Sequence, residues 1–205
     1  MILASHNSWS YAPPQKWYLW PVRFMAKCQN KDIRMQFYSR VRMFDLRVYF
    51  SPAGNILVKH GWMIFKVSEN KLFDDLSFLD TKVITTGPIY VRVMLEQNIE
   101  EENKMQNYQE DNFKDFCKKL EYSFGNLLFI GGTRKFDEKK VYNFSDPTPV
   151  IIHKYSSTTS MFGNNKNKWY AKLDDLWPWL YATTHNATSY ANYIDNPNFL
   201  MLDFI

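Results

Sequence analysis

The feature that most constrains this chain is the alternation of short apolar stretches with segments of helical periodicity. Apolar runs of strand length occur at 2–4, 43–50, 56–61, 88–96, 126–132, 148–157 and 198–205. Helical segments lie between them at 30–41, 68–81, 100–124 and 167–185, the last interrupted at Pro178. Strands that alternate with helices tend to pair in parallel, so the sequence predicts an α/β fold.

Nothing in the composition marks a boundary between domains. The 205 residues include only 7 Gly and 9 Pro, and no Ser/Gly-rich or charged block separates two halves. We therefore expect residues 1–205 to form a single domain around one core.

Ionisable side chains gather where the predicted strands end. They are His6, Asp45, Arg47, His60, Glu96 and Asp203. In folds of this class the functional site lies at the carboxyl ends of the strands. Charged residues are seldom buried without a partner, so packing alone explains such a set poorly.

The charge of the chain limits its ligands. The formal net charge is +4, which suits an anionic ligand or a membrane surface, and no Lys/Arg run supports nucleic-acid binding. Cys28 and Cys117 are far apart and in no metal-ligand spacing, so the sequence supports neither a zinc site nor a disulfide framework.

The start of the chain has no signal-peptide pattern, and no stretch of eighteen apolar residues occurs anywhere in it. We therefore expect a cytoplasmic protein, unless a leader has been removed. We also expect a monomer.

Five short motifs together resemble one protein family. They are SHNS, NKDIRMQFYSRVRMFDLR, ILVKHG, PIYVRVMLE and FLMLDF, in this order along the chain. Their order and spacing are similar to those of the phosphatidylinositol-specific phospholipase C X-domain superfamily, particularly its bacterial branch. The resemblance implies a distorted TIM-like barrel, trimmed because typical barrels of this kind need about 250 residues. Residues 126–196 carry none of these motifs.

The resemblance also implies a division of roles. His6 would act as general base on the inositol 2-hydroxyl, and His60 as general acid on the departing diacylglycerol oxygen. Arg47 would clamp the phosphate. Asp203 would hold His6 in the required tautomer, and Asp45 would support Arg47 or His60.

The metal requirement is open at this stage. In the calcium-dependent branch of the superfamily, Asn and acidic residues bind the ion at the positions matched by Asn7, Asp45, Arg47 and Glu96. Arg47 here brings a positive charge where that set needs a carboxylate, which favours a metal-free mechanism with no cofactor. A calcium site built from Asn7, Asp45 and Glu96 is the alternative.

Further residues complete the predicted site. Asn7 and Glu96 are candidates for substrate binding, as are His153 and Tyr155, which are two apart on a predicted strand and therefore share a face. For His153 and Tyr155, packing explains the pattern equally well. Aromatic residues interleaved with Lys16 and Arg23 suggest a membrane contact, with burial as a cap over the barrel as the alternative. They are Trp9, Trp17, Tyr18 and Trp20.

Two classes of function follow. The first is a phosphodiesterase or lyase that cleaves phosphatidylinositol-like lipids or soluble phosphodiesters through a cyclic intermediate or product. The second is a catalytically silent barrel of the same ancestry that serves as a binding or structural module. The sequence does not decide the head group.

Overall fold

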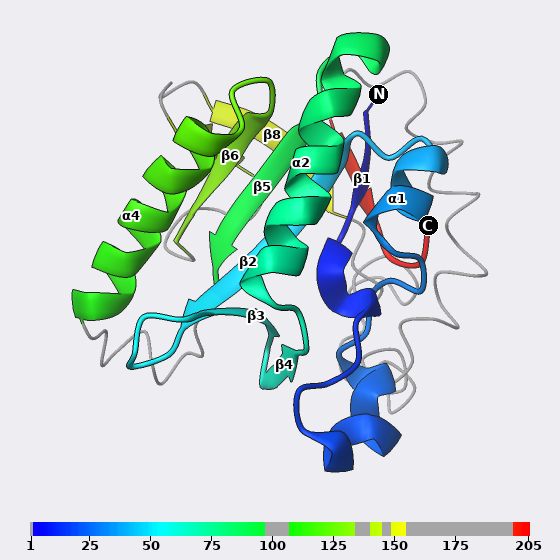
Figure 1. Ribbon diagram of the computed structural model, residues 1–205. Coiled ribbons are helices and arrows are strands. Elements are labelled where there is room, and N and C mark those ends of the chain that lie inside the picture. The colour runs from blue at the N-terminus through cyan, green and yellow to red at the C-terminus, as the bar shows by residue number, and fades with distance from the viewer. Residues whose placement is uncertain (1, 97–106, 134–139, 145–148, 155–198) are drawn as a thin grey trace, which may run out of the picture.

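The computed structural model describes residues 2–96, 107–133, 140–144, 149–154 and 199–205 (Figure 1). Within these ranges, seven strands close into a ring in the order β1-β2-β5-β6-β7-β8-β9. They are β1 (Ile2–Ser5), β2 (Met43–Phe50), β5 (Tyr90–Leu95), β6 (Leu128–Thr133), β7 (Lys140–Asn143), β8 (Pro149–Lys154) and β9 (Phe199–Leu202). Neighbouring strands are parallel except at β7, which runs antiparallel to β6 and β8. The predicted α/β class and the TIM-like barrel are confirmed.

Two further strands extend the sheet outside the ring. β3 (Ile56–His60) pairs antiparallel with β2, and β4 (Met63–Phe65) pairs antiparallel with β3. Strands β4 and β7 were not predicted from the sequence.

Helices cover the outside of the barrel. Figure 1 shows α2 (Glu69–Thr86) and α4 (Asn107–Ser123) beside β5 and β6, and the short α1 (Ile33–Tyr38) beside β1. Ser68 caps α2, accepting a hydrogen bond from the Lys71 backbone N–H at 3.2 Å. Helix α2 continues beyond the predicted end and stops at Gly87, where φ is +82°. The helix predicted at 167–185 lies outside the described residues.

Two 3-10 helices follow β1. The first, η1, spans Ser8–Tyr11, and the second, η2, spans Trp17–Met25. The segment between them is joined to β4 by a bridge from Pro14 to Phe65. None of the described helices is both long and apolar enough to cross a bilayer.

The apolar core has two parts. One lies between the barrel and its helices and includes Phe44, Leu46 and Val48 of β2. The other draws on every strand of the ring, so it fills the barrel interior. Its buried members are Ala4, Met43, Met94, Ile130, Val141, Ile152, Phe199 and Met201.

Gly131 of β6 packs against the backbone of Val93, its partner on β5. A Cβ on Gly131 would lie 1.9 Å from the Val93 carbonyl oxygen. Only glycine allows this approach, because any side chain would collide with the backbone of β5.

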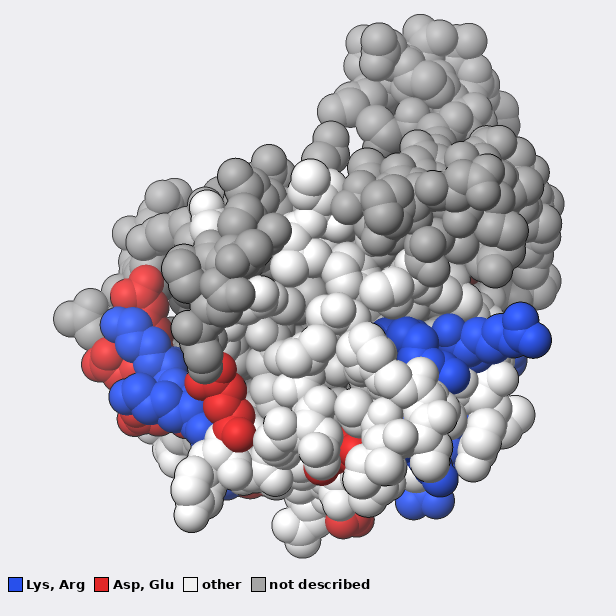
Figure 2. All heavy atoms as spheres, turned by 90° about the horizontal axis from the view of Figure 1, so that it is seen from above, with Lys and Arg blue, Asp and Glu red and all other residues white. Residues whose placement is uncertain are grey.

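Figure 2 views the molecule from above and shows cationic and acidic side chains together on the left flank, where α4 lies. On this helix Lys114 lies 4.0 Å from Asp111, and Lys118 lies 3.6 Å from Asp115. Both of these lysines therefore have a carboxylate of the same helix within 4.0 Å.

Candidate active site

The interior face of the barrel changes from apolar to ionisable within two residues on several strands. Side chains two apart along a strand point the same way, so an apolar residue and the ionisable residue after it share the interior face. The pairs are Ala4 and His6, Met43 and Asp45, Met94 and Glu96, and Met201 and Asp203. The ionisable member always lies nearer the carboxyl end of the strand, so these groups gather at one mouth of the barrel.

Arg47 is the centre of this cluster. Its Nε donates to Asp45 Oδ2 at 2.9 Å, and its Nη1 donates to Glu96 Oε2 at 3.2 Å. Its Nη2 lies 2.9 Å from His6 Nε2. Arg92, which pairs across the sheet with Asp45, donates from Nη1 to Asp45 Oδ1 at 3.3 Å.

The charges in this network stabilise one another. Burial alone would raise the pKa of Asp45, but the guanidinium groups of Arg47 and Arg92 lower it from 3.8 to about 2. Burial alone would lower the pKa of Arg47, but the carboxylates of Asp45 and Glu96 raise it above its usual value. Asp45 is therefore ionised and Arg47 protonated throughout the physiological range.

The contacts of His6 define its protonation state. An arginine nitrogen can only donate, so His6 Nε2 must accept from Arg47 Nη2. The proton of the neutral ring is then on Nδ1, which donates to Asp203 Oδ1 at 2.6 Å. His6 is thus held as the tautomer whose Nε2 lone pair faces the arginine.

His60 is oriented by a backbone carbonyl. Its Nδ1 lies 2.9 Å from the Ala26 carbonyl oxygen, which can only accept, so Nδ1 carries a proton. Its Nε2 is then the atom that can gain or lose a proton. The rings of His6 and His60 meet edge to face, with centroids 5.3 Å apart.

The turn that carries His6 is built by its neighbours. Asn7 adopts the left-handed conformation, with φ at +42°, and its backbone N–H donates to Asp45 Oδ2 at 3.0 Å. The Ser8 hydroxyl accepts the Asp45 backbone N–H at 2.8 Å. The polar run after β1 therefore fixes β1 to β2 beside the arginine. Among the described residues, the buried side-chain amide of Asn7 has no hydrogen-bond partner.

Comparison with known proteins identifies the relatives of this arrangement. The profile for the phosphatidylinositol-specific phospholipase C X domain matches residues 5–123, which is more than half of the chain. The chain belongs to this family. No curated protein sequence matches it.

Solved structures of bacterial phosphatidylinositol-specific phospholipases C share the fold. A variant of the Staphylococcus aureus protein is similar with a TM-score of 0.61 and 15% identity, over 99% of this chain and 85% of that one. The Listeria monocytogenes protein is similar with a TM-score of 0.56 and 17% identity, over 99% and 87% of the two chains.

Most of the cluster lies within the X-domain match. His6, Asp45, Arg47, His60 and Glu96 fall inside residues 5–123, whereas Asp203 comes from β9 at the far end of the chain. Barrel closure between β1 and β9 brings Asp203 to His6.

Two residues at the site were missed or misassigned by sequence reasoning. Arg92 was not among the predicted site residues, and its guanidinium pairs with Asp45. Cys28, whose spacing gave no metal signal, places Sγ 3.6 Å from His60 Nδ1. No pattern in the sequence relates Cys28 to His60, because loop geometry alone brings them together. Neither cysteine is part of a disulfide.

The aromatic segment divides into a buried and an exposed part. Trp9 was grouped with the membrane-facing aromatic residues, and this is wrong: it is fully buried and donates from Nε1 to Asp75 Oδ2 at 3.1 Å. By contrast, Trp17 is 85% exposed and Trp20 is 59% exposed. For Trp17 and Trp20, the alternative of burial as a cap over the barrel is therefore also wrong.

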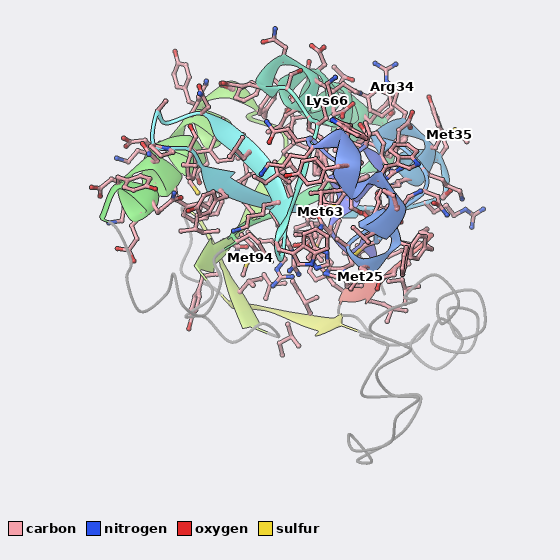
Figure 3. All side chains as sticks on the ribbon, turned by 90° about the horizontal axis from the view of Figure 1, so that it is seen from below. Met25, Arg34, Met35, Met63, Lys66 and Met94 are labelled. Carbon is pink, nitrogen blue, oxygen red and sulfur yellow. The ribbon has the colours of Figure 1, made fainter. Side chains whose placement is uncertain are left out.

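Helix η2 leads toward the mouth of the barrel. In Figure 3, which views the molecule from below, Met25 at the end of η2 lies near the middle with Met63 and Met94, whereas Arg34 and Met35 of α1 lie at the edge. The residue after Met25 is Ala26, whose carbonyl oxygen contacts His60.

The other two predicted substrate-binding residues are His153 and Tyr155. His153 lies on β8, opposite Leu200 of β9 in the backbone register. Tyr155 lies outside the described residues. Their roles stay predictions.

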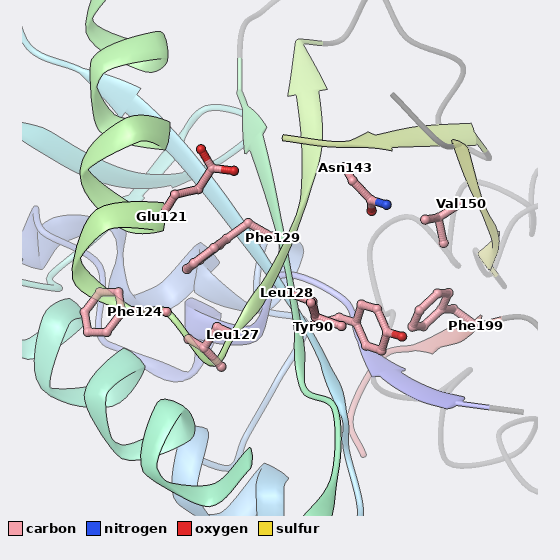
Figure 4. Close-up of a pocket in the computed structure, with 10 residues that line it drawn as sticks. Tyr90, Glu121, Phe124, Leu127, Leu128, Phe129, Asn143, Val150 and Phe199 are labelled. Carbon is pink, nitrogen blue, oxygen red and sulfur yellow. The ribbon is translucent and has the colours of Figure 1, made fainter. Parts of the chain in front are cut away.

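A pocket of about 530 Å³ lies at the other end of the barrel (Figure 4). Tyr90, Leu128 and Phe199, which begin β5, β6 and β9, line it together with Phe124 and Glu121. It shares no residue with the cluster around Arg47.

Proposed function

We propose that this chain is a phosphodiesterase of the phosphatidylinositol-specific phospholipase C type. The observation that carries the proposal is the placement of His6 and His60 beside Arg47, with Asp203 and the Ala26 carbonyl orienting the two rings. One neutral imidazole and one imidazole able to hold two protons form the pair that general acid–base catalysis needs near neutral pH.

The proposed reaction transfers two protons and exchanges one P–O bond for another. Binding of the substrate must first release His6 Nε2 from Arg47 Nη2. His6 Nε2 then takes the proton of the inositol 2-hydroxyl, whose oxygen attacks phosphorus. The bond from phosphorus to the diacylglycerol oxygen breaks, and His60 Nε2 gives that oxygen a proton. The products are a cyclic inositol phosphate and diacylglycerol.

Arg47 would stabilise the charge that grows on the phosphate oxygens. A guanidinium has five N–H donors, and the contacts described above use three of them. The others could bind phosphate, and Asp45 and Glu96 hold the plane of the guanidinium while they do so. The buried amide of Asn7 is a further candidate for binding the substrate.

The same geometry supports a reaction without calcium. Calcium binds six to eight oxygen ligands. Of the three residues in the alternative calcium site, Asp45 and Glu96 both hold the guanidinium of Arg47, which places a cation between the two carboxylates. These residues therefore do not fit a calcium ion while Arg47 is in place.

The exposed face of η2 supports contact with a lipid surface. Trp17, Tyr18 and Trp20 expose more than half of their surface. Lys16 Nζ lies 5.9 Å from the Tyr18 ring, and Arg23 lies 5.1 Å from the Trp20 ring. Tryptophan with cationic neighbours is favoured at membrane interfaces. The staphylococcal phospholipase of similar fold binds membranes.

The test is turnover of a chromogenic inositol phosphodiester in the presence of EGTA. Sustained turnover that is lost in Arg47→Lys supports the metal-free phosphodiesterase, because a lysine cannot reproduce the planar contacts of the guanidinium. Turnover that EGTA abolishes and calcium restores would select the calcium-dependent alternative. No turnover on a panel of phosphodiesters with different head groups would select the silent module.

A further inference from the structure

Three potential metal ligands from three separate segments converge at the mouth of the barrel. One ligand atom from each of His6, Cys28 and His60 lies within 4.8 Å of the other two. Cys28 is buried and has no part in the proton transfers proposed above. Its thiol beside two imidazoles forms the kind of nitrogen and sulfur donor set that zinc prefers.

The spacing of two of these ligands already matches a zinc site. Zinc binds sulfur at about 2.3 Å and nitrogen at about 2.0–2.1 Å, so tetrahedral ligands of the two types lie about 3.6 Å apart. Cys28 Sγ lies 3.6 Å from His60 Nδ1. The remaining ligand atoms need to approach by no more than roughly 1.5 Å, a shift that side-chain rotation can supply.

The backbone holds Cys28 at this position. Its N–H donates to the Ser10 hydroxyl at 2.9 Å, and its carbonyl accepts from the Phe204 N–H at 2.7 Å. These bonds tie the residue to η1 on one side and to the segment after β9 on the other. The backbone that carries the thiol is therefore tied to both segments.

The charge of the described network favours a divalent cation. Its three carboxylates, on Asp45, Glu96 and Asp203, exceed the two guanidinium groups of Arg47 and Arg92 by one. Loss of the Cys28 proton on binding makes the difference two negative charges, which a divalent ion neutralises. Because the metal ligands are nitrogen and sulfur atoms, Asp45 and Glu96 can keep their ion pairs with the arginines when the ion binds.

We propose that His6, Cys28 and His60 form a binding site for a thiophilic divalent cation such as Zn²⁺, and that the bound ion inhibits turnover. The inhibition rests on the function proposed above. Ligation through His6 Nε2 takes up the nitrogen that accepts the substrate proton, and ligation through His60 Nδ1 requires that atom to lose its proton and its bond to the Ala26 carbonyl, which orients the general acid. The ion must also displace the hydrogen bond between Arg47 and His6. Metal binding and the proposed catalysis therefore exclude each other.

The test uses Co²⁺ as a spectroscopic probe of the whole chain. Cobalt bound to a thiolate gives a sulfur-to-metal charge-transfer band, which reports Cys28 ligation without any need for activity. The variants are Cys28→Ser and His60→Gln, and the matched control is Cys117→Ser, which removes the other thiol on α4. Circular dichroism checks that each variant is folded.

The expected result is a band in the wild type and in Cys117→Ser that Zn²⁺ displaces and that is absent from Cys28→Ser. His60→Gln should bind at least about 10–100-fold more weakly, the loss typical even for an outer-shell partner. Turnover of the soluble phosphodiester should fall over the same metal concentrations and return with EDTA.

A band that persists in folded Cys28→Ser, or none in the wild type, would overturn the site. Full turnover with the metal bound would overturn the inhibition. A Cys28-dependent band in a protein that has no turnover even without metal would support the site and count against the proposed function instead.

Discussion

The two layers of the barrel interior use the same strands for opposite purposes. The lower layer, of Met43, Met94 and Met201, is apolar and fills the barrel. The upper layer lies two residues further toward the carboxyl end of the same strands and holds Asp45, Glu96 and Asp203. Arg47 lies between the carboxylates of Asp45 and Glu96. A single step of two residues thus separates the part that stabilises the fold from the part that can perform chemistry.

The comparison shows how a small barrel holds buried charge. Desolvation of isolated charges costs several kcal/mol per ion, so the upper layer depends on mutual pairing. The Asp45 carboxylate accepts hydrogen bonds from two arginines, Arg47 and Arg92. Two more hydrogen bonds tie its strand to the turn at Ser8: the Asn7 N–H donates to the Asp45 carboxylate, and the Asp45 N–H donates to the Ser8 hydroxyl. The lower layer needs no such pairing, because burial of its side chains is favourable in itself.

The largest effect we expect is on turnover. His60→Ala should lower it about 10²–10⁴-fold, because a general acid contributes that much, with little change in the free energy of unfolding. The control Ile130→Ala, in the apolar cluster of the barrel interior, should cost about 2–5 kcal/mol of stability while the folded fraction keeps its activity. Kinetics on the soluble substrate, with denaturant unfolding in parallel, measure both. Equal loss of turnover in the two variants would break the division between the layers.

Removal of a charge from the upper layer should also destabilise the fold. Asp45→Asn leaves Arg47 and Arg92 without their shared carboxylate, and breaking a buried ion pair costs about 3–5 kcal/mol. Urea unfolding measures the loss. The control is Asp111→Asn on α4, whose carboxylate is exposed and 4.0 Å from Lys114, where we expect almost no change. A small effect at Asp45 would mean that the arginines find other partners.

The upper layer should make stability depend on acid. The pKa of Asp45 is about 2 in the fold against 3.8 for the unpaired group. Its ionised form therefore adds about 2 kcal/mol above pH 4, which is lost as the pH falls through 2. Unfolding between pH 6 and pH 2 should show the difference between wild type and Asp45→Asn shrinking by this amount. A constant difference would contradict the lowered pKa.

The smallest effect on stability should come from a residue outside both layers. Trp17→Ala removes a side chain that is 85% exposed, so the free energy of unfolding and soluble turnover should barely change. Vesicle binding and turnover of lipid should fall if η2 contacts the membrane. The matched control is Trp9→Ala at a fully buried position, which should cost about 3–5 kcal/mol. Unchanged vesicle affinity in Trp17→Ala would remove the membrane role of that residue.

Much of the site could be predicted because it depends on strand periodicity. Asp45 and Arg47 are two apart in the predicted strand 43–50, so alternation puts them on one face, and in the structure they form an ion pair. His6, Glu96 and Asp203 follow apolar strands, so the rule that sites lie at strand ends predicted where they would meet. The face of a strand on which a residue lies, and its place at the end of that strand, depend on local backbone geometry. Both can therefore be predicted from the sequence.

Other features depend on contacts between distant segments. The sequence determined the order of strands and helices, the α/β class and most of the ionisable residues at the barrel mouth. Only the tertiary structure decided that Arg92 pairs with Asp45, that Cys28 reaches His60, and that Trp9 is buried while Trp17 is exposed. The physical reason is that a repeat of two residues determines which side of its own strand a side chain faces. The partner on that side is determined by barrel closure and by loops such as the one after η2, which have no such repeat.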